Sequence, residues 1–275
     1  MEFNYFSRNG EMLPIVDAAV PLSNIEYQYG FGVYETIRIA NGTIFFLDDH
    51  LERLIESAQI IGLEHSFTST VIASSIQQLI EKNSAHTCNV KLLLVGGRTA
   101  ADAPLNILCL NPLFPDKKLY RDGVACITYA YERAFPHAKT LNMLQSYLAY
   151  RKAKEAGAYD ALLIDHEGNI TEGTRTNFFC IKDGTIFSPP EEKILLGVTR
   201  KAVLKVAAEN GFTVEQRSIK PADLANYDGA FITSTSSKIL PIQSVDRMQL
   251  NVDAQSFREL MNLFDTFLDS CEGKL

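Results

Sequence analysis

The stretch VYETIRIANGTIFFLDDHLERLIESAQIIGL, residues 33–63, decides the fold class of this chain. Its Asn41-Gly42 pair separates two runs of alternating residues. Because this pair accepts positive φ, residues 33–39 and 43–47 are predicted to form an antiparallel hairpin. Apolar side chains then recur at helical spacing directly behind the hairpin. A hairpin followed at once by an amphipathic helix favours an α+β fold over strict βαβ alternation.

The N-terminal part of the chain repeats this mixture of elements. Asp48 or Asp49 is expected to cap the helix that follows the hairpin. An earlier Asn9-Gly10 pair predicts a second hairpin by the same turn chemistry. The other elements predicted here are a helix over residues 69–83 and buried strands over 89–97 and 105–113.

A break in the periodic pattern suggests a domain boundary. Residues 112–118, PLFPDKK, combine two prolines with a charge cluster and suit neither a helix nor a strand. We therefore expect a smaller N-terminal α+β domain over residues 1–112, a linker over 113–120 and a larger C-terminal domain over 121–275.

The C-terminal part again mixes strands and helices. A helix is predicted from Leu141 to Gly157, and another over residues 199–211. Strands are predicted over 123–131, 159–165 and 212–219, as a pair within 169–189 that turns at Asp183-Gly184, and from 229 into a hydroxyl-rich loop. The expected architecture is α+β, with mixed sheets in both domains.

Composition excludes several classes of function. The 275 residues carry a formal net charge of −7, and the basic residues are scattered, so no nucleic-acid partner is expected. No apolar run is long enough to span a membrane, and the N-terminus lacks the pattern of a signal peptide. The five cysteines are widely spaced, which indicates reduced thiols in a cytoplasmic protein with neither disulfides nor a metal site.

Two charged residues point to a carbonyl cofactor. Lys139 stands alone in a loop before a predicted helix, and Glu172 precedes Gly173 in a turn between strands. A lysine amine forms Schiff bases with carbonyl compounds such as pyridoxal phosphate, which also needs a carboxylate at its ring nitrogen. Each residue taken alone is more often an ordinary surface charge.

Several further features suit a phosphate. Gly197, Val198 and Thr199 open a predicted helix, where free amides and the helix dipole favour an anion, although an ordinary cap explains them equally well. The loop of residues 233–237 adds hydroxyl groups. Arg53 could bind phosphate through its guanidinium or simply cover the core at the rim of its helix.

Taken in order, these features resemble the class IV aminotransferases, the fold-type IV pyridoxal phosphate enzymes. The blocks YGFGVYETIR, LDDHLERLIESA, KTLNML, ALLIDHEGNITEGTRTNFF, LLGVTR and FITSTSSKILPI follow the family order almost end to end. The resemblance implies that Lys139 forms the Schiff base, that Glu172 pairs with the pyridine nitrogen and that Leu195 packs on the ring. It implies cofactor-phosphate contacts from Arg53, Val198, Thr199, Thr235 and Ser236.

The same resemblance implies the reaction and its partners. It indicates a ping-pong transaminase that moves an amino group from a D-amino acid, a branched-chain L-amino acid or an amine to a 2-oxo acid. The alternative is aminodeoxychorismate lyase, which eliminates pyruvate with the same cofactor, and Lys91 is similar to the lyase pattern. A homodimer with active sites at the subunit interface is expected. The implied substrate contacts are Tyr29, Tyr34, Arg38, Lys91 and Arg175.

Overall fold

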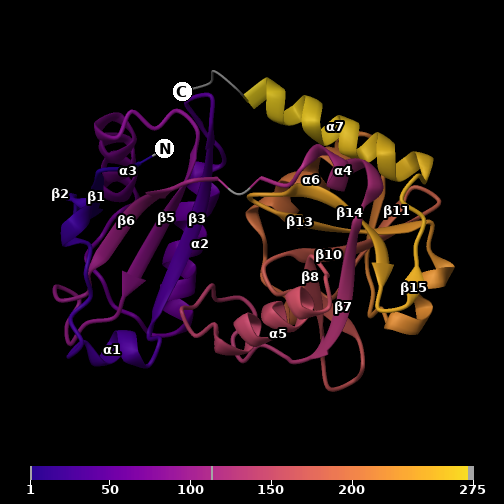
Figure 1. The fold of residues 1–275 in the computed structure, drawn as a ribbon, viewed down its shortest axis with the longest axis horizontal. Coiled ribbons are helices and arrows are strands. Elements are labelled where there is room, and N and C mark those ends of the chain that lie inside the picture. The colour runs from indigo at the N-terminus through magenta and orange to yellow at the C-terminus, as the bar shows by residue number, and fades with distance from the viewer. Residues whose placement is uncertain (1, 113, 272–275) are drawn as a thin grey trace. The chain divides into compact units, whose positions relative to one another are not determined.

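The computed structural model describes residues 2–112 and 114–271, which form two compact units (Figure 1). The N-terminal unit comprises residues 2–112 with Ala138–Met143 and Cys271, and the C-terminal unit comprises Phe114–His137 and Leu144–Ser270. The short segment Ala138–Met143 therefore packs with the N-terminal unit, although the chain on both sides of it belongs to the other. This segment carries Lys139.

The N-terminal unit is built on one six-stranded sheet in the order β2-β1-β6-β5-β3-β4. Every neighbouring pair is antiparallel, so the expectation of a mixed sheet is wrong for this unit. The physical reason is its connections, because the tight turns at Asn9-Gly10 and Asn41-Gly42 reverse the chain at once. The strands are β1 Tyr5–Arg8, β2 Glu11–Pro14, β3 Gly32–Ala40, β4 Thr43–Ile44, β5 Cys88–Val95 and β6 Leu105–Leu110.

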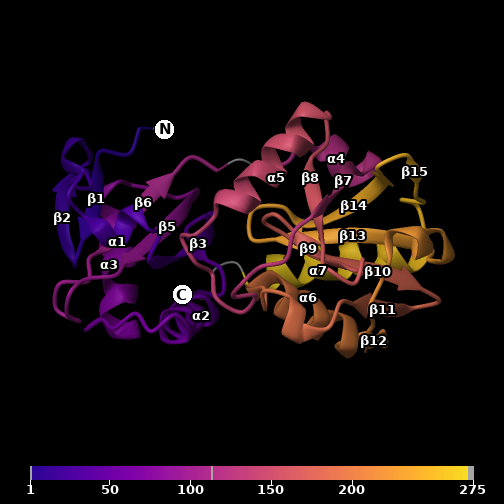
Figure 2. The same cartoon turned by 90° about the horizontal axis from the view of Figure 1, so that it is seen from below.

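Two amphipathic helices, α2 Leu47–Ile60 and α3 Ser69–Lys82, cover one face of this sheet (Figures 1 and 2). Their apolar sides and the facing strand residues form one buried cluster. The predicted cap of the first helix is wrong, because Phe46 occupies the N-cap position and both aspartates lie inside the first turn. The short helices are η1 Ile15–Asp17 and α1 Ile25–Gln28.

The C-terminal unit contains a nine-stranded mixed sheet that closes on itself. Its path runs β12-β11-β10-β13-β14-β7-β8-β9, and β9 also pairs with β10, while β15 adds to β14. The pairs β11–β12, β14–β7 and β7–β8 are parallel and the others antiparallel. The strands are β7 Val124–Ala130, β8 Asp160–Ile164, β9 Ile170–Gly173, β10 Asn177–Lys182, β11 Thr185–Ser188, β12 Thr213–Gln216, β13 Gly229–Ser234, β14 Lys238–Val245 and β15 Met248–Gln249.

Helices surround this closed sheet, as Figure 2 shows. The predicted helix after the lysine begins at Leu144 rather than at Leu141, because the preceding residues pair with β3. The predicted pair of strands over 169–189 is three strands. The helices are α4 Lys117–Asp122, α5 Leu144–Glu155, η2 Glu191–Lys193, α6 Val198–Glu209, η3 Pro221–Asn226 and α7 Gln255–Cys271.

The two-unit α+β architecture confirms the predicted fold class. Within the described ranges, no helix is long and apolar enough to cross a membrane. The cytoplasmic location and the domain limits inferred from the sequence stay predictions, and residue 113 of the predicted linker lies outside the described residues.

Candidate active site

The backbone of the Lys139 segment extends the N-terminal sheet. Tyr34 N donates to Lys139 O at 2.9 Å, and Leu141 N donates to Gly32 O at 2.8 Å, while Val33 and Thr140 form an antiparallel bridge. Hydrogen bonds at Lys139 and Leu141, with the bridge at Thr140 between them, fix the position of the Lys139 Cα more firmly than an unpaired surface loop would. The lysine thus stands on rigid backbone.

The side chain of Lys139 is half-buried and lies against an aromatic ring. Its Nζ is 4.6 Å from the ring centroid of Tyr34, and Lys91 Nζ is 5.2 Å from the same centroid. Lys91 is paired with Thr36 in the β3–β5 register, which places it on the face that also carries Tyr34 and Arg38. Two amines and one phenol ring therefore share this face of the sheet.

Arg53 lies on α2 within a buried charged cluster. Its Nε donates to Glu35 Oε1 at 2.6 Å and its Nη2 to Glu35 Oε2 at 2.9 Å, while His50 Nδ1 is 2.8 Å from Oε2. Burial raises the pKa of Glu35, but the charges of Arg53 and His50 and their hydrogen bonds outweigh it and hold this pKa far below its usual range. Arg53 is therefore held in one orientation.

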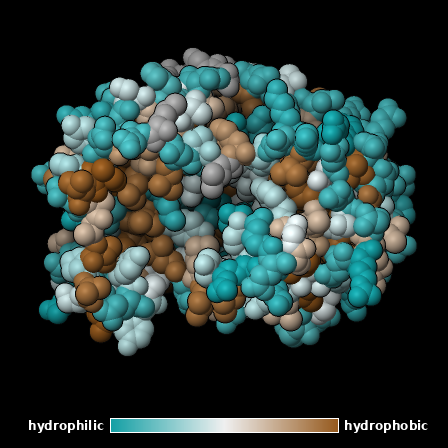
Figure 3. Space-filling view, viewed as in Figure 1, coloured by the Kyte–Doolittle hydropathy of each residue, from teal (hydrophilic) through white to brown (hydrophobic). Residues whose placement is uncertain are grey.

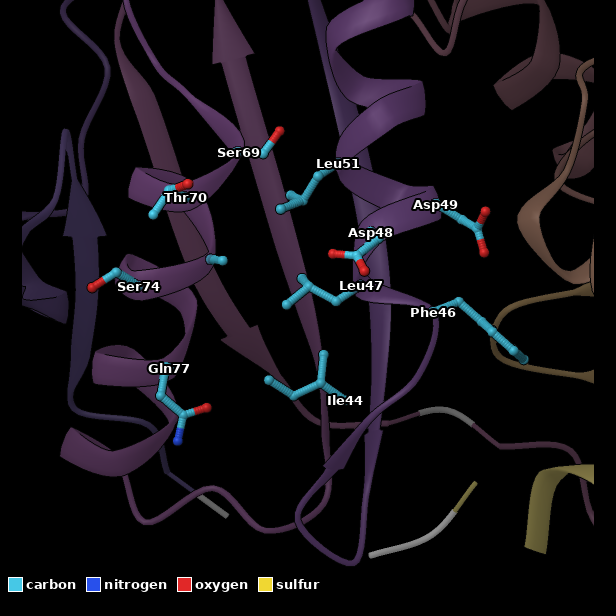
Figure 4. A pocket seen from close by; sticks show the side chains of 11 residues that line it. Ile44, Phe46, Leu47, Asp48, Asp49, Leu51, Ser69, Thr70, Ser74 and Gln77 are labelled. Atoms are coloured by element: carbon cyan, nitrogen blue, oxygen red, sulfur yellow. The ribbon is translucent and has the colours of Figure 1, made fainter. Parts of the chain in front are cut away.

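An open groove on the N-terminal unit does not coincide with these residues. Figure 4 shows it between the first turns of α2 and α3, where Leu47 and Leu51 face Ser69 and Thr70. None of the predicted site residues lines it. Tyr29, at the end of α1, is 78% exposed.

Glu172 is the centre of the predicted site in the C-terminal unit. It ends β9, and its side chain is 3% exposed. Arg133 Nε donates to its Oε1 at 2.6 Å, whereas its Oε2 accepts only a long 3.4 Å contact from Leu195 N among the described partners. The sequence provided no local signal for Arg133, because the two residues are 39 positions apart.

Asn177 connects three of the predicted groups and was missed by the sequence reasoning. In the sheet it pairs with Glu172 on one side and with Thr233 on the other. Its Nδ2 donates to Leu195 O at 2.7 Å, so it also holds the loop that leads into α6. Asn177 lies four residues after Gly173 and begins an apolar strand, and this position in the sequence could have indicated that it belongs to the site.

The start of α6 has the character of an anion site. Gly197 is its N-cap and offers no side-chain hydrogen bond to the first turn, and Thr199 in that turn is 7% exposed. A Cβ on Gly197 would stand 2.0 Å from Asn177 Oδ1, so glycine allows Asn177 to pack against the start of a helix whose first-turn amides can bind an anion. These residues fit the phosphate of a bound cofactor.

The hydroxyl-rich loop is a tight turn between β13 and β14. Ser234 pairs with Lys238, which leaves Thr235 and Ser236 within the turn. Ser234 Oγ lies 2.6 Å from Ser237 Oγ, and Ser237 N donates to Ser234 Oγ at 3.1 Å. The turn is thus ordered by its own serines, and both predicted contact residues are half-buried.

Arg175 lies in the turn that follows Glu172. Its guanidinium carbon is 4.3 Å from the ring centroid of Tyr150 on α5. Burial raises the pKa of Tyr159, while the charge of Arg175 acts on it in the opposite direction. Arg175 is exposed and cationic, as a carboxylate-binding residue would be.

The predicted residues therefore form two groups, one in each unit. Lys139, Tyr34 and Lys91 cluster in the N-terminal unit, where Arg53 and Arg38 also lie. Glu172, the Leu195–Thr199 stretch and the 233–237 turn are linked through Asn177 in the C-terminal unit. Within residues 2–112 and 114–271, no group of three or more histidine, cysteine or acidic side chains could hold a metal ion.

An α+β unit with an antiparallel sheet, followed in the chain by a unit with a closed mixed sheet, is the fold of solved branched-chain aminotransferases. The chain superimposes on the Escherichia coli branched-chain amino acid aminotransferase with a TM-score of 0.90, at 26% identity, covering 96% of this chain and 94% of that one.

Sequence comparison identifies the family. Residues 32–245 match the amino-transferase class IV family, and the chain belongs to that family. It is 34% identical to a D-alanine aminotransferase of Bacillus licheniformis, over 86% of this chain and 87% of that protein. It is 32% identical to a putative branched-chain-amino-acid aminotransferase of Methanocaldococcus jannaschii, over 88% of each. The protein is thus an aminotransferase, and pyridoxal 5′-phosphate is its cofactor.

Proposed function

We propose that the protein is a ping-pong transaminase that transfers the amino group of a D-amino acid to a 2-oxo acid through Lys139. The observation that carries this proposal is the placement of Lys139 on sheet-paired backbone, with its amine against the Tyr34 ring. Without such support, the amine of a loop lysine would not be held at a defined position relative to a substrate carbon.

Bound pyridoxal phosphate supplies an electron sink for the bond that is broken at the substrate Cα. Lys139 carries the cofactor and, once released, moves the proton at Cα. Its sheet-paired backbone supports this role, because the amine then has a fixed reach toward the reacting carbon. Glu172 would hold the ring nitrogen through its Oε2, while its Oε1 accepts from Arg133 Nε at 2.6 Å.

The residues proposed to contact the cofactor phosphate come from both units. In the C-terminal unit, Val198 and Thr199 present the first-turn amides of α6, and Thr235 and Ser236 add the turn between β13 and β14. In the N-terminal unit, Arg53 adds a guanidinium. Leu195 packs on the ring; its amide contact with Glu172 supports this assignment.

The substrate carboxylate is assigned to cationic and phenolic groups. Lys91 and Arg38 share a sheet face with Tyr34, and Arg175 is exposed beside Glu172 in sequence. Tyr29 is proposed to serve the site of a neighbouring subunit, which agrees with its 78% exposure.

The amino donor is proposed to be a D-amino acid, with a branched-chain L-amino acid as the second candidate. The B. licheniformis relative named a D-alanine aminotransferase supports the first, and the M. jannaschii relative named a putative branched-chain enzyme supports the second. The motif KTLNML favours the first as well, because it lacks the tyrosine that branched-chain enzymes often have after the asparagine.

A homodimer is proposed from the surface of the N-terminal unit. Figure 3 shows apolar side chains exposed there. Several lie close together in sequence, and these are Val16, Val20, Leu22, Ile25, Tyr27 and Tyr29. An exposed apolar segment of this kind is typical of a surface that a second subunit covers.

The experiment is a spectral titration of purified enzyme with its cofactor. D-alanine, L-leucine and (R)-1-phenylethylamine are added separately, and conversion of the cofactor to its amine form is followed by absorbance. Conversion by D-alanine alone is the expected result. Conversion by L-leucine alone would move the assignment to the branched-chain class. Pyruvate release from aminodeoxychorismate without conversion by any donor would establish the lyase instead.

A further inference from the structure

We propose that Arg133 is a positioning residue that holds one oxygen of Glu172 and leaves the other for the protonated ring nitrogen of the cofactor. This inference rests on the proposed role of Glu172. It assigns a function to an arginine that the family motifs in this chain do not include.

The two oxygens of Glu172 are in unequal surroundings. Oε1 accepts from Arg133 Nε at 2.6 Å, the length of a strong charge-assisted hydrogen bond. Oε2 has the 3.4 Å contact from Leu195 N, which is long for a hydrogen bond. Because a carboxylate oxygen can accept two hydrogen bonds, Oε2 keeps the capacity for a further donor.

The guanidinium of Arg133 donates three hydrogen bonds. In addition to Glu172, Nη1 donates to Ser146 Oγ on α5 at 3.1 Å, and Nη2 donates to Thr174 O at 2.9 Å. These acceptors come from two separate segments, α5 and the end of β9 with its following turn, and the planar fork of an arginine can reach all of them together. A lysine could pair with Glu172 but could not make the same set of contacts.

The second bound segment is the turn directly after Glu172. Asp160, which is fully buried, fixes that turn from the other side, because its carboxylate accepts from the hydroxyls of Thr174 at 2.5 Å and Thr176 at 2.9 Å. Arg133 and Asp160 therefore hold opposite sides of one turn. The backbone that follows Glu172 is therefore held in place, and the contact from Arg133 to Oε1 holds the carboxylate itself.

The positive charge of Arg133 also affects where a shared proton resides. A ring nitrogen held by Oε2 would be farther from the guanidinium than the carboxylate is, because Arg133 Nε donates to the other oxygen, Oε1. Arg133 therefore stabilises a negative carboxylate more than it disfavours a positive ring nitrogen, because Coulomb energy falls with distance. The expected effect is to keep the proton on the ring, where it makes the ring a stronger electron acceptor.

The test compares Arg133→Gln, Arg133→Lys and Glu172→Gln with the control Arg121→Gln. Arg121 is a matched control because its side chain is 72% exposed and pairs with the neighbouring Asp122. The enzyme is loaded with cofactor labelled with ¹⁵N at the ring, and its resting-state NMR shift, cofactor Kd, kcat and KM are measured. Chemical denaturation of each cofactor-free variant shows whether it is folded.

For Arg133→Gln we expect the ¹⁵N shift to move toward that of unprotonated pyridine and kcat to fall by about 100-fold, the penalty typical of a misplaced catalytic group. KM should change little. Arg133→Lys, which keeps the charge but loses the fork, should lie between Arg133→Gln and the wild type, and Arg121→Gln should match the wild type.

Two other outcomes are distinguishable. If Glu172→Gln loses the protonated signal but both Arg133 variants retain it with unchanged kcat, the Arg133 inference is wrong and the role of Glu172 stands. If Glu172→Gln itself retains the signal, the assigned ring partner is wrong. Should Arg133→Gln not fold, Arg133→Lys decides, since a wild-type shift and kcat in that variant would overturn the proposed need for the fork.

Discussion

Arg53 donates two hydrogen bonds to Glu35, at 2.6 and 2.9 Å, and the glutamate side chain is fully buried. This contact joins α2 to β3, the strand that also pairs with the Lys139 segment. A guanidinium anchored in this way is pre-organised for an anion, because its side chain has little rotamer freedom left to lose.

Replacement of Glu35 tests this cluster through stability. Glu35→Gln should lower the free energy of unfolding at pH 7 by about 3–5 kcal/mol, the usual cost of breaking a buried ion pair. In the wild type the pKa of Glu35 is lowered on folding. The ion pair therefore contributes fully to the free energy of unfolding above about pH 4.3, the ordinary glutamate value, and this contribution is lost as pH falls below it. Urea unfolding at pH 7 and at lower pH should therefore show that the difference in unfolding free energy between the wild type and Glu35→Gln becomes smaller as pH falls.

The control for that measurement is Glu56→Gln, which alters an exposed glutamate on the same helix. Its unfolding free energy should stay within about 0.5 kcal/mol of the wild type. An equal loss in both variants would show that the Glu35 cluster has no special contribution.

Replacement of Lys139 tests the carrier of the cofactor. Lys139→Ala should abolish the absorbance of the covalently bound cofactor and reduce turnover by at least about 1,000-fold, since both the bond and the proton transfer are lost. Spectra and activity are compared with Lys152→Ala, an exposed lysine on α5. A variant with the native spectrum would exclude Lys139 from this role.

Replacement of Glu172 tests the ring partner. Glu172→Gln should retain bound cofactor but lower kcat by about 100- to 1,000-fold, because a preorganised charge beside the ring is lost. Cofactor content by absorbance and kcat by a coupled assay measure the two effects separately. Undiminished kcat would contradict the assignment.

Replacement of Gly197 tests the phosphate site. The new Cβ of Gly197→Ala would collide with Asn177 Oδ1, which lies 2.0 Å from its ideal position. The loop must shift, and cofactor Kd should rise by about 10-fold or more, which equals about 1.4 kcal/mol. Adding Asn177→Ala removes the collision, so the double variant should recover part of the affinity. No change in Kd would place the phosphate elsewhere.

Replacement of Ile25 tests the proposed dimer. Ile25 is 54% exposed within the apolar segment, and Ile25→Asp should shift the protein toward monomer in analytical ultracentrifugation. Activity should fall with dissociation if Tyr29 serves a neighbouring site. Val214→Asp, at a 36% exposed position in the C-terminal unit, is the control. Full activity of a proven monomer would contradict the shared site.

Local chemistry explains why much of the fold could be predicted. The Asn41-Gly42 turn adopts φ values of 51° and 82°, as its residue types favour, and the helical spacing behind it gives α2. Such features depend on neighbours a few residues away, so a single sequence contains them. The late start of α5 at Leu144 was missed because Thr140 and Leu141 pair with the distant strand β3. The cap at Phe46 was missed because this residue has a left-handed backbone and no capping side chain, which residue type does not indicate.

The sequence by itself therefore determined the elements, the α+β class and the individual charged residues that suit a carbonyl cofactor. Tertiary structure alone placed the Lys139 segment in the N-terminal unit, joined Glu35 to Arg53 and brought Arg133 to Glu172 across 39 residues. The reason is physical: turns and helices are short-range, whereas the partner of a buried charge is selected by which segments pack together.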